Sequence, residues 1–263
     1  MPSGSHQSQY NDAVIASVEM VCGDGFMSPG GEQCVARIVE GLDICGKKVL
    51  EVGCGLGGVL VALVRNHDAG SVHGMDLEAS VLARANKRVL AAGLENTIQL
   101  QQVVPGPFPV DDGSFDFVVC KEMLCHIEDK KPFYEELVRT IKPGGWLIGS
   151  DWLISNEAPG TPAYENWRAH LKDAGMIFHF ASFDETVAGF NSAGLKNVEV
   201  SDNFDWITGI HDEHHERVHG SAKQALLDAL GSDGYDALVV RTQNRIEAVE
   251  NGTLLHCNFR AQK

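Results

Sequence analysis

Several features that define other classes of protein are missing from this 263-residue chain. It contains no run of eighteen apolar residues, so no membrane-spanning helix is predicted. The first nine residues are polar and lack the apolar core of a signal peptide. Lysine and arginine, 21 in all against 36 acidic residues, form no basic cluster. Because an enzyme acting on nucleic acid needs such a cluster to offset phosphate charge, neither DNA nor RNA is expected as a partner.

A disulfide framework is also missing. The seven cysteines are odd in number and stand singly along the chain. This usage is typical of reduced thiols, so a cytoplasmic protein is expected. The protein is also expected to be a monomer or a homodimer. The net charge of −15 favours a cationic or neutral small molecule as substrate.

The most informative segment that is present covers residues 49–58, Val-Leu-Glu-Val-Gly-Cys-Gly-Leu-Gly-Gly. A short apolar strand leads into three glycines at alternate positions. Glycine lets the backbone turn sharply and approach a ligand closely, because no Cβ intervenes. Asp76 ends the next predicted strand, where a carboxylate can accept hydrogen bonds from a ribose diol. The pair predicts a cofactor that carries a nucleoside.

Glu51 indicates which cofactor this is. It stands two residues before the first glycine, and the glycines follow G-x-G-x-G-G rather than the G-x-G-x-x-G of dinucleotide-binding loops. A carboxylate there would repel a diphosphate but would suit a cation. S-adenosylmethionine has a sulfonium, an ammonium and no phosphate. The segment resembles the E-x-G-x-G-x-G motif of class I methyltransferases, which implies S-adenosylmethionine as cofactor and S-adenosylhomocysteine as product.

Strands and helices are predicted to alternate, which indicates an α/β fold with a Rossmann-like, doubly wound, mostly parallel seven-stranded sheet and a helical cap over the substrate site. The helix that begins at Asp129 is expected to end at Ile141, before Lys142-Pro143-Gly144-Gly145. The last two strands are expected to form an antiparallel edge pair. The strands are predicted at 47–53, 71–76, 97–103, 115–120, 146–150, 195–200 and 253–259, and the helices at 58–66, 78–92, 129–141, 163–174, 183–192, 206–230 and 235–247.

Four parts follow from this pattern. Residues 1–45 are expected to form N-terminal helices that close the active site, and residues 46–154 the cofactor-binding core. Residues 155–250 are expected to supply the cap together with a core strand near 195–200, and residues 251–263 the final core strand.

Four stretches carry a more specific resemblance. They are Gln9-Tyr10, residues 23–31 (Gly-Asp-Gly-Phe-Met-Ser-Pro-Gly-Gly), residues 51–58, and residues 121–126 (Lys-Glu-Met-Leu-Cys-His). In order and spacing the chain resembles the phosphoethanolamine N-methyltransferases in their compact single-domain form, from about residue 9 to Ala261. That resemblance implies a catalytic dyad of Tyr10 and His126.

The chemistry of that dyad also follows from the side chains. An amine acceptor must be unprotonated before it attacks, and histidine is the side chain best suited to take a proton near neutral pH. Tyr10 can orient the amine, and Glu122, at an acidic position of the family, can hold the ammonium form by charge. The alternatives are that His126 is a loop residue and Tyr10 an aromatic anchor for the N-terminal helix.

The resemblance and the motifs together assign two sets of binding residues. The cofactor set is Met27, Ser28, Glu51, Gly53, Cys54, Gly55, Asp76, Leu77, Val104, Lys121 and His126. The substrate set is Gln9, Tyr10, Glu122, Trp152, Met176, Phe178 and Arg245. Ser28 has a second interpretation, as the N-cap of a helix that begins near Glu32.

The chain also departs from the family. Val103 and Val104 stand where the family has an acidic residue that accepts a hydrogen bond from adenine. Met176 and Phe178 stand near the positions where the family has the arginine and tyrosine that bind the substrate phosphate. Trp152 stands near the position of another tyrosine of the family. A phosphate needs charged donors, and Arg241 or Arg245 alone would hold it weakly. The expected acceptor is therefore a small-molecule amine other than phosphoethanolamine, more apolar or aromatic. Methylation at oxygen or carbon is the open alternative.

One further motif competes with this interpretation. His215-Glu216-Arg217-Val218-His219 spells the H-E-x-x-H of zinc hydrolases on a predicted helix, with His211 and His214 nearby. No third ligand is evident, so no metal-binding residue is assigned. A zinc-binding hydrolase is the less favoured alternative.

Overall fold

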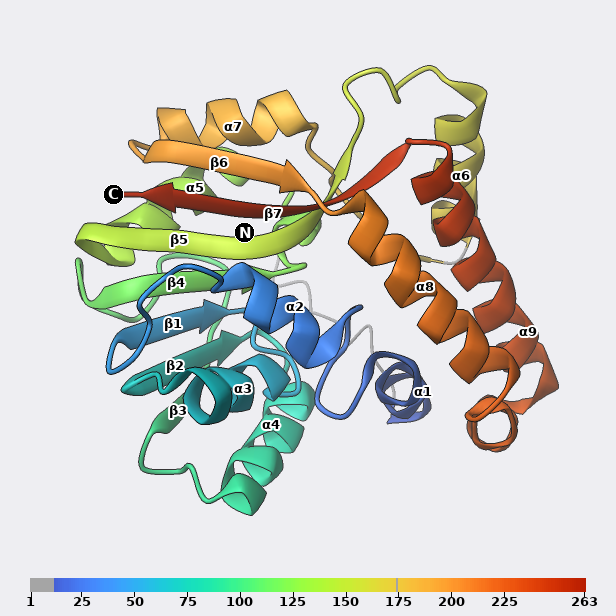
Figure 1. The fold of residues 1–263 in the computed structure, drawn as a ribbon, viewed down its shortest axis with the longest axis horizontal. Coiled ribbons are helices and arrows are strands. Elements are labelled where there is room, and N and C mark those ends of the chain that lie inside the picture. Colours follow the sequence, from blue (N-terminus) through green and yellow to red (C-terminus); the bar gives the residue numbers. More distant parts are fainter. Residues whose placement is uncertain (1–11, 174) are drawn as a thin grey trace.

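A computed structural model describes residues 12–173 and 175–263 of the chain. Seven strands form one sheet in the order β3-β2-β1-β4-β5-β7-β6 (Figure 1). Strands β1 to β5 pair in parallel, and β7 runs antiparallel to both β5 and β6. The predicted Rossmann-like, doubly wound and mostly parallel seven-stranded sheet with an antiparallel edge pair is confirmed.

The strands and helices have the following bounds. The strands are β1 (Lys48–Val52), β2 (Ser71–Asp76), β3 (Ile98–Gln102), β4 (Phe115–Lys121), β5 (Ile141–Ile154), β6 (Lys196–Asp202) and β7 (Leu254–Gln262). The helices are α1 (Asp12–Cys22), α2 (Gly31–Ile38), α3 (Gly58–His67), α4 (Ala79–Ala92), α5 (Lys130–Thr140), α6 (Pro162–Asp173), α7 (Phe183–Ser192), α8 (Phe204–His219) and α9 (Lys223–Glu250). A single 3-10 turn, η1, covers Leu124–His126.

The central strands are buried on both faces because successive side chains point to opposite sides of a sheet. In β4, Phe117 and Val119 face a core that also contains side chains of α2, α3 and α4. Val118 and Cys120 face a second core that contains side chains of α5 and α7. Helices therefore cover both faces of the sheet, as a doubly wound fold requires.

Helices α6, α8 and α9 gather beyond the carboxyl ends of the parallel strands, and α1 packs against α8 and α9 (Figure 1). A separate apolar cluster holds this group together. Trp167 from α6 and Ile207 from α8 meet Trp152 and Leu254 there, at the ends of β5 and β7. No helix of the described ranges is long and apolar enough to cross a membrane.

The boundary predicted between the helix at 129–141 and the strand that follows it was wrong. The helix expected to reach Ile141 ends at Thr140, and β5 begins at Ile141, which pairs with Phe115 of β4. Lys142 precedes Pro143, and a residue before proline is pushed toward extended backbone. The strand therefore starts before the glycines that were expected to form a turn, and it continues to Ile154 because β7 pairs with residues 146–154.

The helix expected over 206–230 is divided at Gly220. This residue has φ −122° and ψ −101°, and a Cβ placed on it would lie 2.7 Å from the carbonyl oxygen of Glu216. A second irregularity lies inside α9, where Gly231 has φ 71° and ψ 175°. Glycine adopts both conformations more readily than other residues, which explains why the chain bends at these two points.

Candidate active site

The glycine loop follows β1 directly and begins at Gly53, with φ 77°. The backbone N–H groups of Gly53 and Cys54 donate to the carbonyl of Met75 at 2.8 and 3.0 Å, so the loop is tied to the end of β2. A Cβ at Gly53 would lie 2.5 Å from Cγ of Met123. Both the backbone conformation and the available space therefore require glycine at this position.

Gly55 is different, because packing within the protein does not require it. Its φ is 52°, but an added Cβ would meet only Sδ of Met27, at an ordinary distance of 3.7 Å. Its N–H donates to Oδ2 of Asp76 at 2.9 Å, and Oδ1 of Asp76 accepts from the N–H of Glu78 at 3.0 Å. Burial raises the pKa of Asp76, while these backbone donors act in the opposite direction.

Glu51 lies under the loop and is almost completely buried, with 1% of its surface exposed. Its Oε2 atom has no hydrogen-bond partner. Burial, reinforced by the nearby carboxylate of Asp76, raises the pKa of Glu51 well above its ordinary value. A buried carboxyl group with a free oxygen is suited to receive a cationic group.

One cavity of about 860 Å³ connects these groups. All eleven residues predicted for the cofactor line it: Met27, Ser28, Glu51, Gly53, Cys54, Gly55, Asp76, Leu77, Val104, Lys121 and His126. Within the predicted substrate set, Glu122 lines the cavity, while Trp152, Met176, Phe178 and Arg245 do not. Gln9 and Tyr10 lie outside the described residues.

Lys121 links two sides of the cavity. Its ammonium donates to the hydroxyl of Ser28, to the carbonyl of Pro29 at 3.1 Å, and to Oε1 of Glu122 at 3.4 Å. The N-cap of α2 is Gly30, and no side chain caps that helix. The alternative role of Ser28 as an N-cap was therefore wrong, and its hydroxyl belongs to the cavity wall.

His126 ends the short turn that follows β4 and is exposed at the cavity. Its ring lies 4.9 Å from the ring of Phe178, centroid to centroid, at an angle of 36°. The surrounding protein lowers the pKa of His126 by desolvation, although the carboxylate of Glu122 opposes the shift. The imidazole is consequently neutral at neutral pH.

Glu122 is the charged group at the same end of the cavity. Nε1 of Trp152 donates to its Oε2 at 2.8 Å, and Nε2 of His256 lies 3.1 Å from its Oε1. Burial alone would raise the pKa of Glu122, but the ammonium of Lys121 and the contact with His256 outweigh it and lower the pKa to about 2. Glu122 is therefore an ionised, buried carboxylate.

The predicted substrate residues outside the cavity lie in or against the cap. Phe178 also stacks on Phe180, with ring centroids 5.1 Å apart, and Met176 packs on the same apolar cluster. The guanidinium of Arg245 lies over the ring of Trp152, 5.9 Å from its centroid, and its Nε has no hydrogen-bond partner. Burial lowers the pKa of Arg245.

The four histidines of α8 divide between two environments. His211 and His214 are buried, with 2% and 1% of their surfaces exposed. His215 and His219 are exposed and contact each other, with ring centroids 4.3 Å apart. Within residues 12–173 and 175–263, no group of three or more histidine, cysteine, aspartate or glutamate side chains is arranged to hold a metal ion. The hydrolase alternative lacks a metal-binding constellation in this part of the chain.

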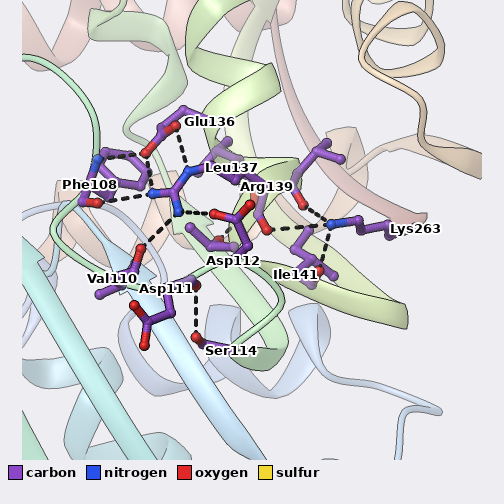
Figure 2. Close-up of polar contacts among 12 residues, drawn as sticks. Phe108, Val110, Asp111, Asp112, Ser114, Glu136, Leu137, Arg139, Ile141 and Lys263 are labelled. Atoms are coloured by element: carbon purple, nitrogen blue, oxygen red, sulfur yellow. Dashed lines mark hydrogen bonds and ion pairs between the residues drawn. The ribbon is translucent and has the colours of Figure 1, made fainter.

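Residues 103–108 after β3 form one wall of the cavity, of which the sequence indicated only Val103 and Val104. Arg139 of α5 fixes this loop (Figure 2). Its guanidinium donates to the carbonyls of Phe108 and Val110 at 3.0 and 2.8 Å, and also pairs with Glu136 and Asp112, each at 2.6 Å. The Pro-Gly-Pro run at 105–107 marks a loop, but nothing local identifies Arg139 as its anchor.

The residues present fit S-adenosylmethionine. The free oxygen of Glu51 would contact the ammonium group of the cofactor, and Asp76 would contact its ribose. The open space at Gly55 would let the cofactor approach the backbone of the loop closely. Leu77, Val103 and Val104 offer apolar surface to the adenine ring. Val104 is 75% exposed, and no acidic side chain stands there, in keeping with the departure seen in the sequence.

Comparison with known proteins gives the same assignment. Residues 50–149 match the family described as a methyltransferase domain. The chain is 27% identical over 245 residues to a phosphoethanolamine N-methyltransferase of Triticum aestivum, covering 93% of this chain and 46% of that protein. It is 22% identical over 224 residues to the Plasmodium falciparum phosphoethanolamine N-methyltransferase, covering 83% of this chain and 80% of the other.

Among solved structures, phosphoethanolamine N-methyltransferase 2 of Haemonchus contortus in complex with S-adenosyl-L-methionine superposes with a TM-score of 0.87 at 22% identity. It matches 98% of this chain and 58% of the other. The chain spans about half the length of the plant relatives it matches. It carries a class I, S-adenosylmethionine-dependent methyltransferase domain and resembles the phosphoethanolamine N-methyltransferases.

Proposed function

We propose that this S-adenosylmethionine-dependent methyltransferase transfers a methyl group to the nitrogen of a small-molecule amine. One observation carries the proposal. A single cavity joins the glycine loop and Asp76 at one end to the neutral imidazole of His126 and the ionised carboxylate of Glu122 at the other. A base and an anion beside a methyl-donor site suit an acceptor that arrives as an ammonium ion.

The two groups have separate tasks. Glu122 holds the acceptor ammonium by charge, since its pKa of about 2 keeps it ionised. His126 removes the ammonium proton, which frees the nitrogen lone pair for attack. The cofactor supplies an activated methyl group on a sulfonium. Tyr10, which the family resemblance pairs with His126, is proposed to orient the amine.

The acceptor is proposed to be an amine without a phosphate. Relatives of this chain are named for phosphoethanolamine. Met176 and Phe178, however, pack in an apolar cluster at positions where the resemblance expects an arginine and a tyrosine. A phosphate dianion needs charged donors, and the guanidinium of Arg245 lies over the ring of Trp152 and does not line the cavity. A more apolar or aromatic amine suits this environment, because the ring of Phe178 packs against His126 of the cavity.

The test is an amine panel, including phosphoethanolamine, assayed with the wild-type chain and with His126→Asn and Tyr10→Phe. Loss of the base is expected to reduce turnover by about 100-fold or more. Binding of S-adenosylhomocysteine should stay within about threefold, because neither substitution removes a charge from the cofactor end. His215→Asn, on the exposed face of α8, is the matched histidine control and should retain full turnover.

Product analysis by mass spectrometry and NMR then identifies the methylated atom. Unchanged turnover in both His126→Asn and Tyr10→Phe contradicts the proposed dyad. A product methylated at oxygen or carbon contradicts N-methylation. Phosphoethanolamine emerging as the best acceptor contradicts only the proposed acceptor class.

A further inference from the structure

A buried network of hydrogen bonds joins Glu122 to residues that do not line the cavity. Trp152 of β5 and His256 of β7 are directly opposite each other in the antiparallel register. Their side chains contact different oxygens of Glu122, at 2.8 and 3.1 Å, and their rings meet edge to face at 4.8 Å. His256 is fully buried. The carboxylate is thus held at both oxygens by one cross-strand pair.

The network of hydrogen bonds continues from His256 to Asn203 and Arg37. Nδ2 of Asn203 lies 3.2 Å from Nδ1 of His256 and 2.8 Å from Oδ1 of Asn258. Oδ1 of Asn203 accepts from Nη2 of Arg37 at 3.1 Å. Asn203 is 3% exposed and occupies the N-cap position of α8, yet its side chain does not cap that helix. The side-chain amide of Asn203 instead makes hydrogen bonds within this network.

The direction of each hydrogen bond follows from Arg37. A guanidinium can only donate, so the oxygen of the Asn203 amide must face it and the NH₂ group must face His256. Nδ1 of His256 therefore accepts and carries no proton. In the neutral ring the proton then resides on Nε2, which faces Glu122 and donates to it.

We propose that His256 is a positioning residue for the acceptor, with its Nε2–H tautomer fixed by Arg37 through Asn203, so that Glu122 stays ionised and aimed at the cavity. The inference rests on the proposed function, in which Glu122 holds the acceptor ammonium. A buried carboxylate without donors would take up a proton and lose the charge that attracts the substrate.

The backbone supports the same purpose. Glu122 has φ 51°, a left-handed conformation that is uncommon for a residue other than glycine, and its N–H donates to the carbonyl of Ser150 at 2.7 Å. Strained backbone of this kind persists where the surroundings determine it. Trp152 and His256 hold the side chain of Glu122 in place by hydrogen bonds, and the ammonium of Lys121 provides the opposite charge at 3.4 Å.

The first measurement is the ¹⁵N NMR spectrum of His256 in the full chain, labelled at histidine and assigned with His256→Gln. Nδ1 is expected to give a pyridine-type resonance and Nε2 an N–H resonance. In Asn203→Asp, a carboxylate replaces the amide and still pairs with Arg37, but it can only accept. Nδ1 should then become protonated. A protonated Nδ1 in the wild-type chain overturns the proposal.

The second measurement compares two substitutions of His256 that differ in reach. Glutamine can place an N–H near the position of Nε2, whereas asparagine can imitate only Nδ1. His256→Asn is expected to raise the KM for the acceptor about tenfold or more, with the Kd for S-adenosylhomocysteine within about twofold. His256→Gln should restore KM to within about threefold of the wild-type value.

The outcomes separate this inference from the proposed function. Equal KM values for wild type, His256→Asn and His256→Gln overturn the positioning role, even if the tautomer is as expected. If Glu122→Gln also leaves the acceptor KM unchanged, the proposed role of Glu122 fails with it. If Glu122→Gln raises KM while both His256 variants do not, only the positioning role is wrong.

Discussion

The backbone N–H of Gly55 donates to Oδ2 of Asp76 at 2.9 Å, which ties the middle of the glycine loop to the end of β2. The carboxylate therefore shapes the loop as well as standing where a ribose would bind. The second oxygen is occupied by the N–H of Glu78 at 3.0 Å. One side chain thus holds the two backbone segments that frame the nucleoside end of the cavity.

Asp76→Asn is expected to weaken binding of S-adenosylmethionine by about 10- to 100-fold. An amide has a single acceptor oxygen, so the N–H of either Gly55 or Glu78 loses its hydrogen bond to a charged group. Such a hydrogen bond is worth about 1.5–3 kcal/mol. Isothermal titration calorimetry measures the change. Asp205→Asn, at an exposed position in the first turn of α8, is the control. Affinity within twofold of wild type for Asp76→Asn would contradict the assigned role.

Glu51 should make cofactor binding depend on pH. Its raised pKa means that the free protein holds a proton on this group up to a higher pH than usual. A cationic ligand favours the ionised form, so binding must expel that proton whenever the pH lies below the raised pKa. Affinity is expected to fall as pH decreases through this range and to level off above it.

The measurement is calorimetric titration in buffers of different ionisation enthalpy, which reports proton release directly. Glu51→Gln, which cannot titrate, should bind more weakly above the raised pKa and should show no release from this position. Equal proton release in wild type and Glu51→Gln means that another group titrates.

Arg139 is expected to influence the cofactor although it does not line the cavity. Arg139→Met keeps much of the side-chain volume but removes the donors to Phe108 and Val110 that fix the loop shown in Figure 2. Its side chain is 27% exposed, so the effect should be moderate, about three- to tenfold in the Kd for S-adenosylmethionine. Lys142→Met removes a surface ion pair with Asp116 and serves as the control, with no expected change in Kd.

Limited proteolysis gives an independent check on Arg139. The loop of residues 103–108 should be cleaved faster in Arg139→Met than in Lys142→Met. If cleavage and affinity are the same in both variants, the other contacts of the loop are sufficient and Arg139 is not its anchor.

The cofactor end of the site could be predicted from the sequence because its residues are local to motifs. Glu51, the glycines and Asp76 lie at the ends of two neighbouring parallel strands, and the βαβ pattern alone places them together. The acceptor end could not be predicted in this way. Glu122 meets His256 only because β7 pairs with β5 in one particular register, and sequence periodicity does not specify the register between distant strands.

The errors in the elements have local causes of the same kind. A proline-glycine run after α5 resembles a turn, but Ile141 before it and Trp146 after it both pair with β4, so the run lies inside β5 at a shift in register. On α8, His211 was expected close to the H-E-x-x-H motif that begins at His215. Packing against the cap core buries the first and leaves the second exposed. Tertiary contacts, rather than propensity, decided both cases.

The long pairing of β5 with β7 has a consequence for how acceptor specificity can change. Both strands run without interruption from the core sheet into the cap, where Trp152, Ile154 and Leu254 join its apolar cluster. The cap is therefore an extension of the sheet, and it cannot be exchanged between relatives as a separate module. A chimera that joins a foreign cap at residue 155 would leave these three side chains facing an unmatched surface. Exchange of single side chains at positions 176 and 178 would leave the shared strands intact, and it offers the simpler route to a new acceptor.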